Sequence, residues 1–313
     1  MSLVDASAVL VSFASPSPVA CCYLVFAAVL VVGLAVIFLR GDWHRARGFD
    51  KLILFGPLFY AAPLAAFGTE HFTITTIIAS MVPRWIPWHL FWAYFVGACF
   101  IAAGFSIVTK VQARLAASLV GLTFLIFVAS MDVPGWLRNP GNRLALALAL
   151  RELSFGAGAL ALVASLSESR ERHPLATIAR YFIAVAVLVY SFEQFRHADH
   201  VPGVPLQMVT PAYVVGHAIW TYVTAAVYAV GGVLLLIGKK TRAAATSIGG
   251  MILVGVLIVY VPIAVVERAS LVGFNYLADT LMFCGAVLLL AGAMPQEEPV
   301  ENLSRQEAVA TGR

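Results

Sequence analysis

The chain has 313 residues, of which 61% are apolar and only 12% are charged, with a net charge of +4. Soluble domains carry about 25% charged residues, so this composition excludes an ordinary soluble protein. Apolar runs of about 20 residues recur, each long enough to cross the hydrocarbon of a bilayer as a helix. The alternating ten-residue segments of an outer-membrane barrel are absent from the sequence. We therefore predict a polytopic membrane protein.

The N-terminal segment has no basic region, so a cleaved signal peptide is not expected. Four cysteines lie in or beside apolar segments and form no C-x-x-C pair: Cys21, Cys22, Cys99 and Cys284. This arrangement argues against a membrane thiol–disulfide enzyme and against a thiolate zinc site. We expect these cysteines to act as small apolar packing residues.

The apolar segments predict nine helices in an all-α transmembrane bundle. Their expected ranges are 18–40, 51–69, 87–109, 113–131, 144–166, 175–196, 212–237, 243–265 and 271–293. The tail from Pro295 is polar and acidic, which predicts disorder.

The distribution of Lys and Arg predicts the orientation of these helices. Counted over alternate loops and the C-terminal tail, one side holds 14 of the 20 Lys and Arg residues and the other side holds 6. The richer side is expected to face the cytoplasm. The N-terminus is then outside and the C-terminus is cytoplasmic.

A pattern of histidine and aromatic residues occurs twice near the start of a helix. His89, Trp92 and Tyr94 follow a proline-containing turn, and an equivalent set follows a second such turn: His217, Trp220 and Tyr222. The pattern predicts two copies of a four-helix unit. The expected organisation is an N-terminal helix and basic loop (1–50), a first repeat (51–170), a second repeat (171–294) and a cytoplasmic tail (295–313). An even number of helices in each unit predicts parallel repeats, related by an axis along the membrane normal.

Several of these features resemble one known family. Glu70-His71-Phe72 near a helix end, the VPGVPL turn at 201–206 and the helices that open with histidine and aromatic residues resemble the DoxX-like bacterial integral membrane proteins. Over roughly residues 51–293 the resemblance occurs twice. It implies a bacterial cytoplasmic (inner) membrane location. The family name comes from a subunit of a thiosulfate:quinone oxidoreductase, so the resemblance also implies a redox-associated role and a redox partner subunit.

Ionisable groups inside a bilayer cost about 2.5–3.5 kcal/mol each on insertion scales, so their positions predict a site. Glu152 and Asp279 lie about eight residues past their expected helix starts, or about 12 Å deep at 1.5 Å per residue. We expect a polar pocket between the two units, open to the outer side. Its predicted residues are Glu70, His89, Trp92, Tyr94, Arg151, Glu152, Glu193, His217, Trp220, Tyr222, Asn275 and Asp279.

Structural roles are an alternative for the same residues. Tryptophan and tyrosine at helix ends anchor helices at the membrane interface, and Arg151 with Glu152 or Asp279 is equally consistent with a structural ion pair. One local pattern suggests a metal ion: Glu193, His197 and His200 share a face if their helix extends that far, and a carboxylate with two imidazoles suits zinc, iron or copper.

Three functions remain open from the sequence. The first is a redox-associated protein that holds a quinone or works with a quinone-linked partner, because a quinone needs an apolar slot and a proton-relaying group. The second is a carrier or chaperone for a small molecule or metal ion, and the third is a non-catalytic assembly subunit. Whether the chain is an enzyme is left open. Since no phosphate-binding signature is present, neither a nucleotide nor a nucleic acid is expected as a partner.

Overall fold

The computed structural model describes residues 17–167, 173–204 and 207–296, except for the side chain of His217. Within these ranges nine helical segments are long and apolar enough to cross a membrane. The prediction of an all-α, multi-pass bundle is thus confirmed. The predicted disorder of the tail falls on residues outside the described ranges beyond Gln296.

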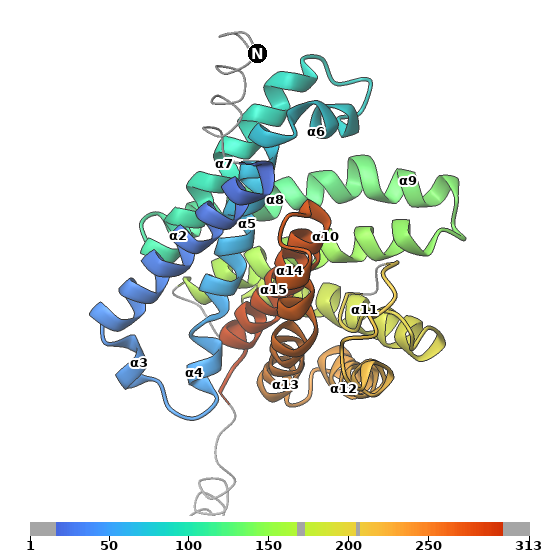
Figure 1. Cartoon of the computed structure of the whole chain (residues 1–313). Helices are drawn as coiled ribbons and strands as arrows, with labels where there is room; N and C mark the ends of the chain where they lie inside the picture. Colours follow the sequence, from blue (N-terminus) through green and yellow to red (C-terminus); the bar gives the residue numbers. More distant parts are fainter. Residues whose placement is uncertain (1–16, 168–172, 205–206, 297–313) are drawn as a thin grey trace, which may run out of the picture.

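The long helices come in chain order, and several of the links between them contain shorter helices (Figure 1). Their bounds are α2 (Pro18–Leu39), α5 (Gly56–Thr73), α7 (His89–Thr109), α8 (Ala113–Phe127), α10 (Arg143–Ser165), α11 (Pro174–Arg196), α12 (His217–Ile237), α13 (Thr241–Gly255) and α15 (Leu271–Ala293). The shorter helices are α3 (Asp42–Arg45), α4 (Asp50–Ile53), α6 (Thr75–Met81), α9 (Val133–Arg138) and α14 (Val261–Val266).

Helix starts follow from local capping. Ser17, Asn142 and Ser270 each accept a hydrogen bond from a backbone N–H three residues later, at the starts of α2, α10 and α15. These side chains satisfy donors that the first turn of a helix leaves unpaired. Proline occupies the first position of α2 and of α11, where its missing N–H costs nothing.

The helix α15 lies at the centre of the bundle. It packs against α5, α10 and α13, and 83% of its membrane-spanning window is buried, compared with 28% for α2. α2 instead covers the outside of α5 and α7 (Figure 1). A central α15 allows residues near the C-terminus to contribute to sites formed by the first half of the chain.

Three late helices repeat the lengths of three earlier ones at one spacing. α12, α13 and α15 begin 128 residues after α7, α8 and α10 (217 against 89, 241 against 113, 271 against 143), with shared lengths of 21, 15 and 23 residues. Each 15-residue helix continues through a five-residue π-helical turn, η1 (Val128–Asp132) or η3 (Val256–Tyr260), into a helix that begins Val-Pro.

The ends of α5 and α11 correspond at a spacing of 123 residues. The N–H of Ile74 donates to the Glu70 carbonyl, and the N–H of His197, 123 residues later (197 against 74), donates to the Glu193 carbonyl. Residues related by these two spacings are called counterparts below. The first unit is α5, α7, α8 and α10, and the second unit is α11, α12, α13 and α15.

Counterparts also make similar contacts. Phe72 packs against Tyr94 with ring centroids 5.6 Å apart, and their counterparts, Phe195 and Tyr222, do so at 6.3 Å. Between the units, α5 packs on α15 and α11 packs on α10, while α10 and α15 pack on each other. The fourth helix of each unit therefore lies against the first helix of the other.

Candidate functional site

A cavity of about 480 Å³ lies inside the first unit. Its walls come from α5, α6, α7, α8, η1 and α10, and two residues of α15 complete it. One end carries ionisable side chains, and the remainder is lined by aromatic and aliphatic ones. The volume is in the range of small-molecule sites, which are mostly apolar with a few convergent polar groups.

An ion pair between α10 and α15 forms part of the polar end. Arg151 Nη1 lies 2.6 Å from Asp279 Oδ2, and Arg151 Nη2 lies 3.4 Å from Glu152 Oε1. All three side chains are at least 83% removed from solvent, with exposures of 17%, 16% and 7%. Arg151 and Asp279 are counterparts (279 against 151), so they meet where the two central helices pack. A buried charge needs such a partner, because its desolvation is expensive.

Two further carboxyls, Glu70 of the cavity wall and Asp132 of η1, have no cation within ion-pair distance in the described part of the chain. Glu70 is 7% exposed, faces the Asn275 amide and leaves Oε1 without a hydrogen-bond partner there. Asp132 contacts the Glu152 carboxyl, and one oxygen of each is likewise unsatisfied within the described residues. Buried polar atoms are nearly always hydrogen-bonded. The polar end therefore has acceptor sites ready for a ligand or a proton.

His71 also lines the cavity and was not among the predicted site residues. Its Nδ1 lies 2.8 Å from the Phe67 carbonyl, and its ring packs edge-on against Phe100. A carbonyl only accepts hydrogen bonds, so Nδ1 carries the proton and Nε2 of the neutral ring is an acceptor. His71 lines the cavity because α5 extends to Thr73. The sequence places that helix end at 69, which leaves His71 in a loop.

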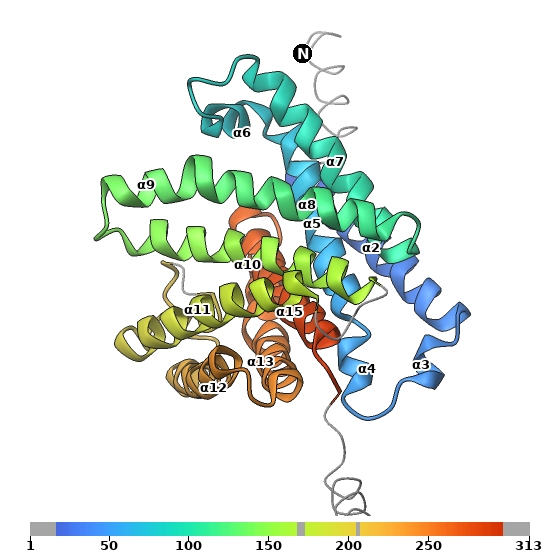
Figure 2. The same ribbon diagram turned by 180° about the vertical axis from the view of Figure 1, so that it is seen from behind.

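The apolar part of the cavity opens at the side of the bundle. Met81, Trp92, Phe95 and Ile126 line it and are also 38–61% exposed at the surface. They come from α6, α7 and α8, and Figure 2 shows α7 and α8 diverging from the turn that joins them. Both helices belong to membrane-spanning segments. The mouth therefore faces the level of the lipid chains.

The structure brings together six of the twelve predicted pocket residues: Glu70, Trp92, Arg151, Glu152, Asn275 and Asp279. Five others lie elsewhere: His89, Tyr94, Glu193, Trp220 and Tyr222. Tyr94 and Tyr222 are 46% and 49% exposed, and Trp220 donates to the Val215 carbonyl at 3.2 Å. The remaining residue, His217, has a side chain outside the described part of the structure. The cavity thus lies within one unit and reaches α15, rather than lying symmetrically between the units.

Glu193 makes a separate contact. Its Oε2 lies 2.5 Å from Arg143 Nε at the start of α10. The predicted metal set of Glu193, His197 and His200 requires a longer α11, but the helix ends at Arg196. Asp199 takes the place of the glutamate: ligand atoms of His197, Asp199 and His200 all lie within 4.8 Å of one another.

Outside the spanning segments, His200 Nδ1 lies 2.9 Å from Asp199 Oδ1. This hydrogen bond lowers the pKa of the exposed Asp199 carboxyl below its ordinary value. Two imidazoles and one carboxylate are a zinc-type ligand set. The chain can therefore offer three ligands to a divalent ion at the end of α11.

The region of the second unit that corresponds to the cavity is filled by the chain itself. Residues 201–204 form a loop in which Val201 and Val204 are fully buried. The Gly203 carbonyl accepts a hydrogen bond from Gln194 Nε2 at 3.1 Å, and the Pro202 carbonyl accepts one from the Tyr260 hydroxyl. Gln194 is the counterpart of His71. We call residues 201–204 the plug, since they occupy the space that stays open in the first unit.

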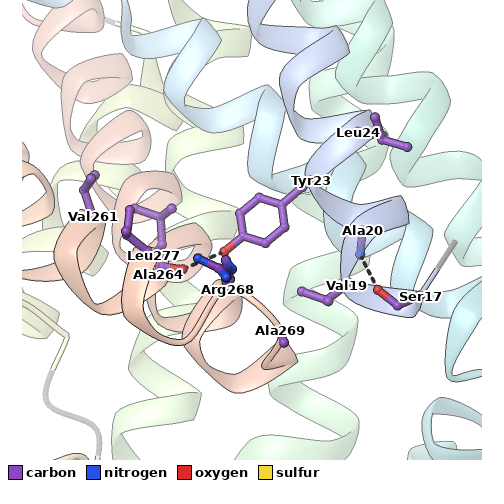
Figure 3. Close-up of a pocket in the computed structure, with 11 residues that line it drawn as sticks. Ser17, Val19, Ala20, Tyr23, Leu24, Val261, Ala264, Arg268, Ala269 and Leu277 are labelled. Carbon is purple, nitrogen blue, oxygen red and sulfur yellow. Dashed lines mark hydrogen bonds between the residues drawn. The ribbon is translucent and has the colours of Figure 1, made fainter.

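A second, larger groove of about 730 Å³ lies between α2 and α14. Tyr23 reaches across it, and its hydroxyl donates to the Ala264 carbonyl at 3.4 Å (Figure 3). Arg268 is the one ionisable side chain besides Tyr23 among its described lining residues. This groove therefore has much less polar chemistry to offer than the cavity of the first unit.

The chain matches no protein-family model, no curated protein and no solved structure.

Proposed function

We propose that the chain is a duplicated DoxX-like protein of the bacterial inner membrane, and that the cavity of its first unit holds a lipid-soluble, quinone-type molecule for a membrane redox process. The observation that carries the proposal is the shape of the cavity: an apolar mouth at the level of the lipid chains and an inner end with His71, Glu70 and Glu152. A molecule dissolved in the bilayer enters such a site sideways and meets its polar groups last.

The duplication is supported by pairs of counterparts that pack on each other. α10 and α15 meet at Gly158 and Ala286, which are counterparts (286 against 158), and a Cβ on Gly158 would lie 2.5 Å from that of Ala286. Arg151 and Asp279 form a second such pair. Contacts between equivalent residues are expected along a two-fold axis. The parallel direction of α10 and α15 fits an axis along the membrane normal.

The inner end has the groups that quinone chemistry uses. A quinone exchanges protons whenever it exchanges electrons, so its site benefits from an acid or base within hydrogen-bond reach. His71 Nε2 is an acceptor, and Glu70 and Glu152, each with one unsatisfied oxygen, line the same cavity. The sequence has neither paired thiols nor a haem-attachment motif. Electrons are therefore expected to pass to or from a partner subunit.

The distribution of basic residues supports an orientation in which the polar end faces the outer side. The loops that hold most Lys and Arg, such as the one with Arg45, Arg47 and Lys51, lie at the opposite ends of the helices. With the positive side inside, the N-terminus is outside, the C-terminus is cytoplasmic and the cavity faces the periplasmic half of the membrane.

A carrier for an amphiphilic cation is the second candidate, because three carboxyls in the cavity wall accompany one guanidinium. The packing below the site argues for a binding site rather than a pathway. The buried Tyr60 hydroxyl donates to the Phe155 carbonyl at 2.8 Å, and Gly285 lies against the backbone of α5. This dense packing closes the way to the other side of the bundle.

The test is ligand binding by the purified full-length protein in lipid nanodiscs. A quinone analogue with a decyl tail should bind with a stoichiometry near one, and Glu70→Ala should weaken binding by about tenfold, since a lost charge-assisted hydrogen bond costs about 1.5–3 kcal/mol. Glu193→Ala is the matched control, because this counterpart lies outside the cavity. Failure of the wild-type protein to bind any quinone analogue, together with saturable binding of a decyl ammonium compound, would replace the proposal with the carrier.

A further inference from the structure

The plug of the second unit is held by hydrogen bonds to side chains of the helices around it. Two consecutive peptide carbonyls, of Pro202 and Gly203, both accept: one from the Tyr260 hydroxyl and one from the Gln194 amide. A Cβ added to Gly203 would also contact the Thr280 side chain at 3.4 Å. Donors on α11 and η3 therefore face the two carbonyls of the plug, and the Gly203 N–H donates in return to Gln194 Oε1 at 3.4 Å.

In the first unit, the counterparts of these residues have the opposite hydrogen-bonding character. Gln194 corresponds to His71 (194 against 71), Tyr260 to Asp132 (260 against 132) and Thr280 to Glu152 (280 against 152). Where the second unit has an amide and hydroxyls, the first unit has a bare imidazole nitrogen and two carboxyls. One oxygen of each carboxyl has no hydrogen-bond partner among the described residues, and neither has the donor Arg151 Nε. A hydroxyl can donate to such acceptors and accept from such a donor, whereas a carbonyl can only accept.

We infer that the ligand of the first unit presents two hydrogen-bond donors: one where the plug has the Gly203 carbonyl, and one beside the Asp132–Glu152 carboxyl pair, of which Glu152 lines the cavity. The chemical class that fits is a lipid-soluble aromatic diol, such as a quinol, with one hydroxyl donating to His71 Nε2 and the other to the carboxyl of Glu152. This inference rests on the proposed function and adds that the site selects the reduced, dihydroxy head over the oxidised, dicarbonyl head.

The walls distinguish a diol from an ammonium group, which also donates hydrogen bonds. The Arg151 guanidinium lies at the same end of the cavity, 3.4 Å from Glu152, so the Glu152 carboxyl already has a cationic partner. Phe100, Phe124 and Phe155 line the neighbouring wall, and flat rings of this kind pack well against an aromatic head. A neutral aromatic diol meets both conditions.

The second unit supplies the controls for this inference. Replacing His71 by Gln or Glu152 by Thr installs the residue that the second unit has at the corresponding position. Each change replaces the acceptor with a group that also donates, without introducing an unrelated side chain. Gln194→His makes the reverse change beside the plug. Since the plug already fills that space, this variant should not alter ligand binding in the first unit.

The experiment compares decyl ubiquinol with decyl ubiquinone, two probes that differ in the head group alone, by equilibrium dialysis against the full-length protein in nanodiscs under anaerobic conditions. The quinol should bind at least about tenfold more tightly, because the quinone leaves buried acceptors unpaired. The preference should shrink in His71→Gln and in Glu152→Thr and persist in Gln194→His.

The outcomes separate the two proposals. Equal binding of both probes, or tighter binding of the quinone, overturns the selection of the diol and leaves a quinone-type site in place. Binding of neither probe overturns both. Because the comparison of the two probes uses the wild-type protein, it does not depend on whether a variant folds.

Discussion

The ion pair between Arg151 and Asp279 should be a main source of stability at the centre of the bundle. We predict that Arg151→Met destabilises the protein by about 3–5 kcal/mol, the usual cost of leaving a buried charge without its partner. The structure supports the upper part of this range. The guanidinium lies 2.6 Å from Asp279 and 3.4 Å from Glu152, so its loss leaves two buried carboxyls uncompensated.

The Coulomb attraction between the paired charges is about as large as the predicted loss of stability. Two unit charges about 4 Å apart attract by about 4 kcal/mol at an effective dielectric constant of 20. Since each 1.36 kcal/mol is a factor of ten, the ratio of folded to unfolded protein should fall by about 10²–10⁴. The double variant with Arg151→Met and Asp279→Leu should recover most of the loss, because apolar residues can replace a buried pair at little cost.

The assay is reversible unfolding in mixed micelles, followed by the helical signal in circular dichroism. Arg143→Met is the matched control: its pair with Glu193 is more exposed, at 36% for the arginine, and exposed pairs contribute about 0–1 kcal/mol. The reasoning is refuted if Arg151→Met loses no more stability than this control, or if the double variant is no more stable than the single one.

Three further predictions concern packing, protonation and metal binding. Gly97→Leu should destabilise the protein by about 1–3 kcal/mol or more and displace His71, because a Cβ at Gly97 would lie 2.5 Å from the His71 Cβ. Gly135 has open space around it, so Gly135→Leu should unfold at the same temperature as the wild type. The hydrogen bond from His200 lowers the pKa of Asp199 in the folded state. The stability that this hydrogen bond contributes is therefore fully present above the ordinary aspartate pKa of about 3.9, and it is lost as the pH falls through the lowered pKa. Thermal melts between about pH 5 and pH 2 should show this loss in the wild type and not in Asp199→Asn. Calorimetry should detect one zinc ion that is lost in His197→Ala and in His200→Ala but retained in Glu193→Ala; dependence on Glu193 instead of Asp199 would contradict the observed ligand set.

Local properties of the sequence were sufficient to predict the helices and the all-α membrane class of the fold. Apolar runs predict nine spans, and α15 begins and ends at the predicted residues, 271 and 293. The larger differences occur where a local signal conflicts with packing. Residues 212–216 look helical but precede the observed start of α12 at His217, and residues 132–138 continue α8 through η1 and past Pro134.

The sequence alone shows which ionisable groups lie within the apolar segments: carboxyls, an arginine and histidines. Because such groups need partners inside a membrane, a polar site could be predicted. Which of these groups meet does not follow from it, because that depends on how helices far apart in the chain pack. The packing brings Asp279 to Arg151 and places His71 in the same cavity as Glu152, while Glu193 pairs with Arg143. It also fills one cavity with residues 201–204 and leaves the other open. The link between the first two helices has 15 residues in the first unit (74–88) and 20 in the second (197–216). Within the described residues, the longer link is the one that folds back between the helices, at 201–204.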